Sequence, residues 1–140
     1  MTLSAEKLLS LMKIDQAVFE RPWSEKSWQA HQARTGSFCH LITSQNSLAG
    51  FVAGCAGHGE VEIFKVGVLP KYRRAGLARA AIVELFTKCK PCTKIILEYA
   101  DDNRAAAALY ESLGFEKFFT RKSYYNEGQD AHCMQLLNQP

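Results

Sequence analysis

The sequence contains no apolar run that approaches the ~20 residues a helix needs to cross a membrane. Its first residues, M-T-L-S-A-E-K, lack the positively charged and then apolar pattern of a secretory leader. We therefore expect a cytoplasmic protein with no membrane partner.

Internal repeats, low-complexity segments and interdomain linkers are also absent from the sequence. Its 140 residues suffice for one hydrophobic core, so we expect a single domain spanning residues 1–140. A net charge of +3 is too small to indicate direct nucleic-acid binding by itself. The composition, 47% hydrophobic and 22% charged, is ordinary for a globular protein.

The cysteines give little support to a disulfide framework or a metal site. There are five, an odd number, in apolar segments, which is typical of thiols in a reducing compartment. Cys89 and Cys92 have the C-x-x-C spacing of redox proteins, but they follow a predicted helix, at the end where the dipole disfavours a thiolate. A zinc site would need two more ligands, and no second close-spaced Cys/His pair exists. We predict no metal site, and the role of the Cys89/Cys92 pair stays open.

The spacing of apolar residues predicts the order ααβββαβαββ, a mixed α/β domain with helices packed on a sheet. Helical spacing covers residues 4–19 and 25–34, the second helix with Ser24 as its N-cap. Gln45-Asn46 joins the first two strands as a hairpin. The predicted strands are Ser37–Thr43, Leu48–Ala56, Glu60–Leu69, Lys94–Ala100, Phe115–Arg121 and Asp130–Leu137, and further helices start near Gly76 and Asn103.

An anion-binding turn is predicted within Val66–Arg79, where V-G-V-L-P-K-Y-R-R-A-G-L-A-R runs from a strand through a basic turn into a helix. A helix start leaves backbone N–H groups unpaired and directs the positive end of the helix dipole at the turn. Gly76 and Ala78 carry no bulk that would keep a phosphate from the main chain. Mobile positive charge would come from Arg73, Arg74 and Arg79. We predict a pyrophosphate site; the alternative is an ordinary strand–helix connection with solvated arginines.

Glu98 is the polar interruption of an otherwise apolar strand, which would place its carboxylate in a desolvated position or at a cleft. A solvent-facing residue on a half-buried strand is the alternative, and Glu60 and Glu62 are rival carboxylates. Tyr110 belongs to the apolar stripe of its helix, so it could equally be a core residue with its hydroxyl at the rim. The basic, aromatic segment Arg121–Tyr125 suits a peptide or nucleotide contact, although a solvated strand end has the same composition.

Two motifs together resemble the GNAT family of N-acetyltransferases. The turn R-R-A-G-L-A, Arg73–Ala78, is similar to the family's [Q/R]-x-x-G-x-[G/A] signature, with alanine in place of the commoner last glycine. The segment N-R-A-A-A-A-L-Y-E-S-L-G-F, Asn103–Phe115, is similar to the second half of the family's acetyl-CoA site, at the expected distance and order. Short glycine patterns recur by chance, but two motifs in register over about 50 residues are strong evidence.

Within that family, the flanking segments resemble the RimI-type enzymes, which acetylate the N-terminal alanine of a small-subunit ribosomal protein. These segments are Phe19–Trp28 and the tail R-K-S-Y-Y-N-E-G-Q-D-A-H-C-M, and the whole resemblance covers about residues 8–137. It implies the GNAT fold, a central, mostly antiparallel sheet with flanking helices. Because only about three residues precede the first helix, we expect the family's first edge strand to be short or missing. Lys65 stands where RimI-type enzymes often have asparagine, beside the peptide entrance.

The resemblance also implies roles for individual residues. Main-chain groups of Val66, Gly67 and Val68 would bind the pantetheine arm, and the Val68 N–H would polarise the thioester oxygen. Asn103 would contact CoA, while Glu98 would be the general base and Tyr110 the general acid. The pyrophosphate would lie on Arg74, Ala75, Gly76, Leu77, Ala78 and Arg79, with Arg73 as a further cofactor contact.

We therefore predict an acetyl-CoA-dependent acetyltransferase for the N-terminal α-amino group of a protein. The resemblance implies that this group is the N-terminal alanine of a small-subunit ribosomal protein. Direct transfer from acetyl-CoA to the amine needs no enzyme nucleophile, so we interpret the cysteines as structural. One alternative is a GNAT enzyme acting on a small-molecule amine or a lysine side chain. Another is a non-catalytic acyl-CoA-binding module; the presence of both Glu98 and Tyr110 argues against it, because CoA binding requires neither.

Overall fold

Two helices begin the fold, which is described by a computed structural model for residues 1–89, 92–125 and 128–137. Helix α1 (Ala5–Val18) starts after Ser4, whose side chain accepts a hydrogen bond from the Lys7 N–H. Helix α2 (Glu25–Ala33) starts in the same way after Ser24. Both helices are confirmed, and so is Ser24 as an N-cap.

In the described part of the chain, six strands form one mixed sheet in the order β1-β2-β3-β4-β6-β5. Within the described residues, β3 and β4 are the one parallel pair, and every other neighbouring pair is antiparallel. The order ααβββαβαββ is confirmed, with a short 3-10 helix, η1 (Pro70–Tyr72), before the third α-helix. No strand precedes α1 in the described part of the chain, as expected. The strands are β1 (Ser37–Ser44), β2 (Ser47–Gly57), β3 (Glu60–Val68), β4 (Lys94–Ala100), β5 (Glu116–Arg121) and β6 (Ala131–Leu137).

The β1–β2 connection is the two-residue hairpin predicted from Gln45-Asn46. Both residues have positive φ, 51° and 64° respectively. Two central residues of positive φ make the kind of turn whose twist matches that of the flanking strands.

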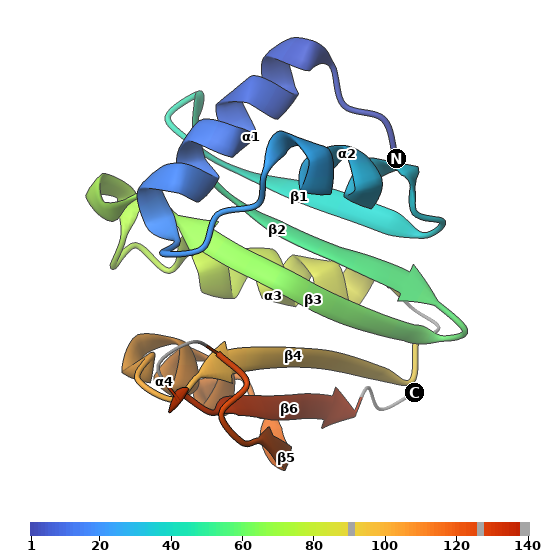
Figure 1. Ribbon diagram of the computed structural model, residues 1–140, viewed down its shortest axis with the longest axis vertical. Helices are drawn as coiled ribbons and strands as arrows, with labels where there is room; N and C mark the ends of the chain where they lie inside the picture. Colours follow the sequence, from blue (N-terminus) through green and yellow to red (C-terminus); the bar gives the residue numbers. More distant parts are fainter. Residues whose placement is uncertain (90–91, 126–127, 138–140) are drawn as a thin grey trace.

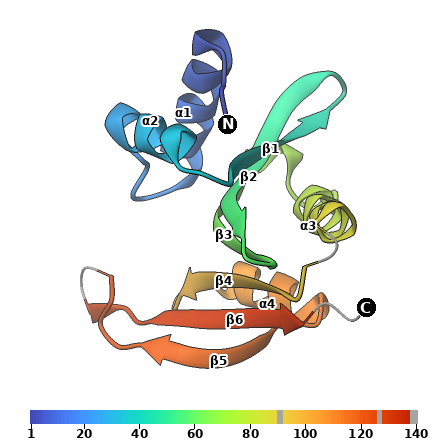
Figure 2. The ribbon, with the colours of Figure 1, turned by 90° about the vertical axis from the view of Figure 1, so that its right-hand side faces the viewer.

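Helices cover both faces of the sheet, as Figures 1 and 2 show. Helices α1 and α2 lie on one face of β1–β3, over a core that includes Leu11, Trp28 and Phe51. Helices α3 (Leu77–Lys88) and α4 (Arg104–Ser112) lie on the other face, over a second core that includes Ile82 and Tyr110. None of the described helices is both long and apolar enough to span a membrane.

A bulge at Phe64 changes which residues of β3 face each layer. Ile63 pairs with Gly54 of β2, and Lys65 pairs with the adjacent Ala53, so Phe64 is an extra residue in β3. Before the bulge, Ile63 points into the α3/α4 core; after it, the even-numbered Val66 does so. Lys65 consequently points toward α1 on the opposite face.

Candidate active site

The sheet opens between β3 and β4, the strands that precede α3 and α4. Their ladder is limited, in the described chain, to Glu60–Glu62 against Lys94–Ile96, and the strands then diverge toward their C-terminal ends (Figure 1). The Leu69 N–H donates to the Ala49 carbonyl of β2. Because main-chain groups alternate along a strand, those of Val68 and Val66 face the opening. The structure thus leaves polar main-chain groups along one wall of the gap.

Gly67 differs from Val66 and Val68 in the direction of its main-chain groups and in the packing around it. It pairs with Phe51, and its main-chain groups face β2 by the same alternation. A Cβ atom added to Gly67 would lie 2.8 Å from the Phe19 ring, so the glycine makes room for the end of α1. Packing therefore explains why a glycine stands at position 67. The main-chain groups that can form hydrogen bonds toward the opening are those of Val66 and Val68.

The predicted anion turn has the geometry its sequence indicates. Gly76, in the left-handed conformation with φ 72°, is the N-cap of α3 and has no side chain to cap it. The first hydrogen bond of the helix runs from the Ala80 N–H to the Gly76 carbonyl. The N–H groups of Leu77, Ala78 and Arg79 therefore precede the helical ladder, at the positive end of the dipole. This arrangement fits a pyrophosphate group.

Two of the turn's arginines make side-chain hydrogen bonds within the protein. Arg73 Nε donates to the Val68 carbonyl at 2.9 Å, and an Arg79 N–H donates to Ser112 Oγ at 2.6 Å. These two arginines of the turn thus have hydrogen-bond partners. Arg79 joins the start of α3 to the end of α4, which links the two sequence motifs physically. Arg74 has φ 65°, the left-handed conformation that reverses the chain before Gly76.

A cavity of about 630 Å³ lies at the opening of the sheet and brings together the predicted residues Val66, Glu98, Asn103 and Tyr110. Its walls come from β3, β4, α4, the α1–α2 connection and the β5–β6 connection. The other lining residues include Phe19, Arg21, Trp23, Phe64, Lys65, Tyr99, Tyr124 and Tyr125.

Glu98 lies where this cavity meets a neighbouring one of about 430 Å³. Its side chain is 32% exposed, and its Oε2 lies 3.6 Å from Arg121 Nε of β5. The same oxygen is 3.7 Å from the Cys133 Sγ, a weak donor on β6. Glu98 is thus a half-buried carboxylate at a cleft.

The rival carboxylates are placed differently. Glu60 forms an ion pair with Lys94, with 3.5 Å between Oε1 and Nζ, at the closed end of the β3–β4 ladder. Glu62 is exposed and lines the neighbouring cavity together with Glu98. Glu62 therefore remains a competitor for proton transfer, while Glu60 lies away from the opening.

Tyr110 is a deeply buried residue of the cavity with a polar hydroxyl group. It is 6% exposed and packs against the rings of Tyr99 and Phe115, with centroids 6.2 and 5.9 Å away. Burial, with a smaller contribution from Tyr125, raises the pKa of Tyr110 to about 12. The hydroxyl therefore keeps its proton at neutral pH and can act as a donor.

Asn103 is first of all a helix cap. Its Oδ1 accepts a hydrogen bond from the Ala106 N–H at 3.1 Å at the start of α4. The residue also lines the large cavity, where its side-chain NH₂ group is a possible donor to a ligand.

Tyr125 and Tyr99 line the cavity but were not singled out individually by the sequence. Burial is the main cause that raises the pKa of Tyr125 to about 12, and the charge of Glu98 adds to it. Burial likewise raises the pKa of Tyr99. The aromatic, basic composition around Tyr125 was the one available signal; Tyr99 looked like an ordinary strand aromatic.

A buried ion pair holds the α1–α2 connection against β3. Lys65 Nζ lies 2.6 Å from Asp15 Oδ1, and the two residues are 8% and 0% exposed. Asp15 Oδ2 accepts hydrogen bonds from the Trp23 N–H and the Trp28 Nε1–H, at 2.9 and 3.0 Å. Lys65 Nζ also lies 4.5 Å from the Phe19 ring centroid. We call Asp15 and Lys65 the buried pair; it fixes Trp23 at the edge of the cavity.

Cys89 and Cys92 lie close together, with 2.9 Å between their sulfur atoms. The two residues between them are outside the described part of the chain. Burial raises the pKa of Cys39 to about 12, so its thiol is unreactive at neutral pH. Among the described residues, no group of three or more His, Cys, Asp or Glu side chains could hold a metal ion.

Comparison with known proteins shows which family the chain resembles. The acetyltransferase (GNAT) family matches residues 8–115. The [ribosomal protein bS18]-alanine N-acetyltransferase of Escherichia coli is 33% identical over 141 residues, covering 96% of this chain and 94% of the relative. The N-alpha-acetyltransferase RimI of Mycobacterium tuberculosis is 32% identical over 123 residues, covering 84% of this chain and 77% of the relative.

A solved structure shows the same fold throughout. The crystal structure of the ribosomal-protein-S18-alanine N-acetyltransferase from Escherichia coli superposes with a TM-score of 0.89 and 31% identity. The match covers 100% of this chain and 93% of the other.

Proposed function

The chain belongs to the acetyltransferase (GNAT) family and is an N-acetyltransferase that uses acetyl-CoA, and from this premise we propose that its acceptor is the N-terminal α-amino group of a protein. The N-terminal alanine of a small-subunit ribosomal protein is the proposed target, by similarity to the bacterial relatives. We further propose that residues 1–140 act as one acetyltransferase domain in the cytoplasm.

The observation that carries this proposal is the shared cavity of Glu98 and Tyr110 at the opening between β3 and β4. A carboxylate that is half-buried beside a cleft can take a proton from an ammonium group, directly or through water. A protonated tyrosine in the same cavity can donate its proton to the CoA sulfur when the bond between that sulfur and the acetyl group breaks. The two roles require different protonation states, and the structure places the two groups in different environments.

Main-chain groups would bind the cosubstrate and polarise it. The Val68 N–H faces the opening and would donate to the thioester oxygen, while Val66 would hold the pantetheine arm. The turn from Arg74 to Arg79 would hold the pyrophosphate on the unpaired N–H groups at the start of α3. Asn103 would add a contact from its amide group. Acetyl-CoA itself supplies the activated acyl group.

Acetyl transfer to a matched set of acceptors tests the proposal. The set consists of a short peptide beginning with alanine, the same peptide with a blocked N-terminus and an internal lysine, and a spermidine-like amine. We expect turnover on the first peptide alone. Turnover mainly on the blocked peptide or the polyamine would instead assign the lysine or small-amine alternative. Tight acetyl-CoA binding without turnover on any amine would identify a binding module.

A further inference from the structure

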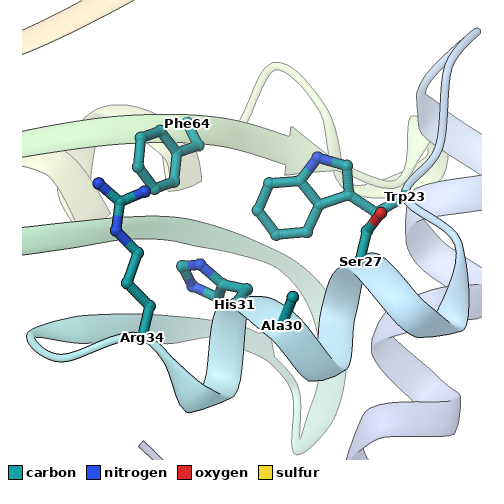
Figure 3. Close-up of a pocket in the computed structure, with 6 residues that line it drawn as sticks. All are labelled: Trp23, Ser27, Ala30, His31, Arg34 and Phe64. Atoms are coloured by element: carbon teal, nitrogen blue, oxygen red, sulfur yellow. The ribbon is translucent and has the colours of Figure 1, made fainter.

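A hollow beside α2 is left unused by the proposed chemistry (Figure 3). Its volume is about 330 Å³, and we call it the α2 hollow. The lining residues are Trp23, Ser27, Ala30, His31, Arg34 and Phe64.

The α2 hollow adjoins the proposed acceptor site. Trp23 and Phe64 line this hollow, the large cavity that contains Tyr110, and the neighbouring cavity that contains Glu62. Glu98 lines the last two. A polypeptide with its N-terminus beside Glu98 therefore has a path over Trp23 and Phe64 into the hollow.

Aromatic rings form the walls of the hollow. The ring centroid of His31 lies 5.1 Å from that of Trp23 and 5.9 Å from that of Phe64. Figure 3 shows these three rings facing a common space, with Arg34 reaching up beside Phe64. The guanidinium carbon of Arg34 lies 5.3 Å from the centroid of the Phe64 ring.

The charge of the hollow restricts what it can accept. Burial is the main cause that lowers the pKa of His31, so its imidazole is neutral at neutral pH, with Nε2 3.1 Å from the Phe38 carbonyl. Arg34 is then the one charged residue among the six, and it disfavours a cationic occupant. Arg34 is exposed to solvent, so an ion pair with a carboxylate would add little. Ring contacts and a cation–π contact with Arg34 favour an aromatic occupant instead.

We propose that the α2 hollow binds an aromatic side chain near the N-terminus of the acceptor polypeptide. This inference rests on the proposed function and adds a specificity determinant to it. The occupant's ring packs against the surface that Trp23, His31 and Phe64 form together, with the Arg34 guanidinium at its edge.

Filling the hollow from its rim tests the proposal without touching the large cavity. Ala30 is exposed on α2, so Ala30→Trp places bulk in the hollow at little cost to folding. Gln29→Trp is the matched control, because Gln29 is exposed on the same helix and is not among the residues that line the hollow. The substrates are peptides that begin with alanine and carry one phenylalanine, glutamate or lysine, scanned through the first few positions of an otherwise all-alanine sequence.

We expect phenylalanine at one position of the peptide to raise the kcat/KM of the unmodified enzyme on the order of tenfold over that for the all-alanine peptide. Ala30→Trp should abolish that preference while leaving kcat/KM for the all-alanine peptide unchanged, and Gln29→Trp should retain it. If the enzyme acetylates the peptides with no aromatic preference, or with a preference that survives Ala30→Trp, the proposed role of the hollow is wrong while the proposed function stands. A glutamate preference that is lost in Arg34→Ala also overturns the proposed role of the hollow. No turnover on any peptide overturns both the hollow and the proposed function.

Discussion

At the scale of single residues, Glu98 and Tyr110 are distinguished by what surrounds their polar groups. Glu98 lies near Arg121 and remains open to two cavities, whereas Tyr110 is almost completely buried. Glu98 stands out in the sequence as one polar residue in an apolar strand, whereas Tyr110 fits the apolar stripe of its helix, and the roles of both are predicted from the family resemblance. It could not tell Glu98 from Glu62, because the bulge at Phe64 and the divergence of β3 from β4 decide which carboxylate reaches the opening.

Glu98→Gln removes the proposed base while keeping the side chain's shape. We expect kcat to fall by about 10²-fold at low pH and by less at high pH, where the amine has already lost its proton. Rates with an alanine peptide across a pH series measure the effect, with Glu62→Gln as the control that keeps the profile. A pH profile that is unchanged in Glu98→Gln, but altered in Glu62→Gln, would transfer the role of base to Glu62.

Tyr110→Phe removes a hydroxyl whose pKa burial raises to about 12. Because the raised pKa keeps the phenol protonated through the neutral and mildly alkaline range, its ionisation should cause no loss of wild-type activity there. We expect the variant to lose about 10²-fold in kcat with little change in the KM for acetyl-CoA. Tyr99→Phe, in the same cavity, is the control. A higher KM with an unchanged kcat would show that Tyr110 serves in binding.

At the scale of secondary-structure elements, local signals predicted most of the fold. The N-cap at Ser24, the Gln45-Asn46 turn and the glycine before α3 all act within a few residues of their own positions. The buried pair was not predicted, because Asp15 and Lys65 are 50 residues apart and Asp15 looks like an ordinary polar residue of a surface helix. The register that turns Lys65 toward α1 depends on the bulge, which has no local signature in the sequence.

Lys65→Met should destabilise the protein by about 3 kcal/mol, because it leaves the Asp15 carboxylate buried without its cation. Urea unfolding measures the loss, and Asp15→Asn added to Lys65→Met should restore part of it. Lys88→Met is the control, since Lys88 pairs with Glu84 on the exposed surface of α3 and such pairs contribute little. Equal effects of Lys65→Met and Lys88→Met would show that the buried pair does not hold the α1–α2 connection.

Gly76→Ala separates backbone strain from ligand contact at the start of α3. Gly76 and Gly59 have φ values of 72° and 76°, and a Cβ atom at either position meets nothing within 4 Å. Each alanine variant should therefore lose about 1 kcal/mol of stability from strain. Calorimetric titration should show weaker acetyl-CoA binding in Gly76→Ala and unchanged binding in Gly59→Ala. Equal affinities in the two variants would place the pyrophosphate elsewhere.

At the scale of the whole molecule, the opening in the sheet forms a cavity that is lined by elements from both faces of the sheet. The turn before α3 lies beyond the end of β3, while the buried pair and the α2 hollow belong to the α1/α2 face. The cavity with Glu98 and Tyr110 has walls from both sides. An acyl donor and a polypeptide acceptor could thus meet without an enzyme-bound intermediate. The sequence predicted the order of helices and strands along the chain and the packing of helices on a sheet, but the shape of the acceptor side arises from contacts between residues far apart in the chain.

Intact-mass spectrometry of small-subunit ribosomal proteins, with and without this enzyme, tests the central claim most directly. Proteins from cells that lack the enzyme are treated with it and acetyl-CoA, then fragmented to locate any added acetyl group. We predict the gain of a single acetyl group on the α-amino nitrogen of a protein that begins with alanine. The same treatment with Glu98→Gln at low pH should leave that protein largely unmodified. Acetylation confined to lysine side chains, or no acetylation of any of these proteins by the active enzyme, would contradict the account.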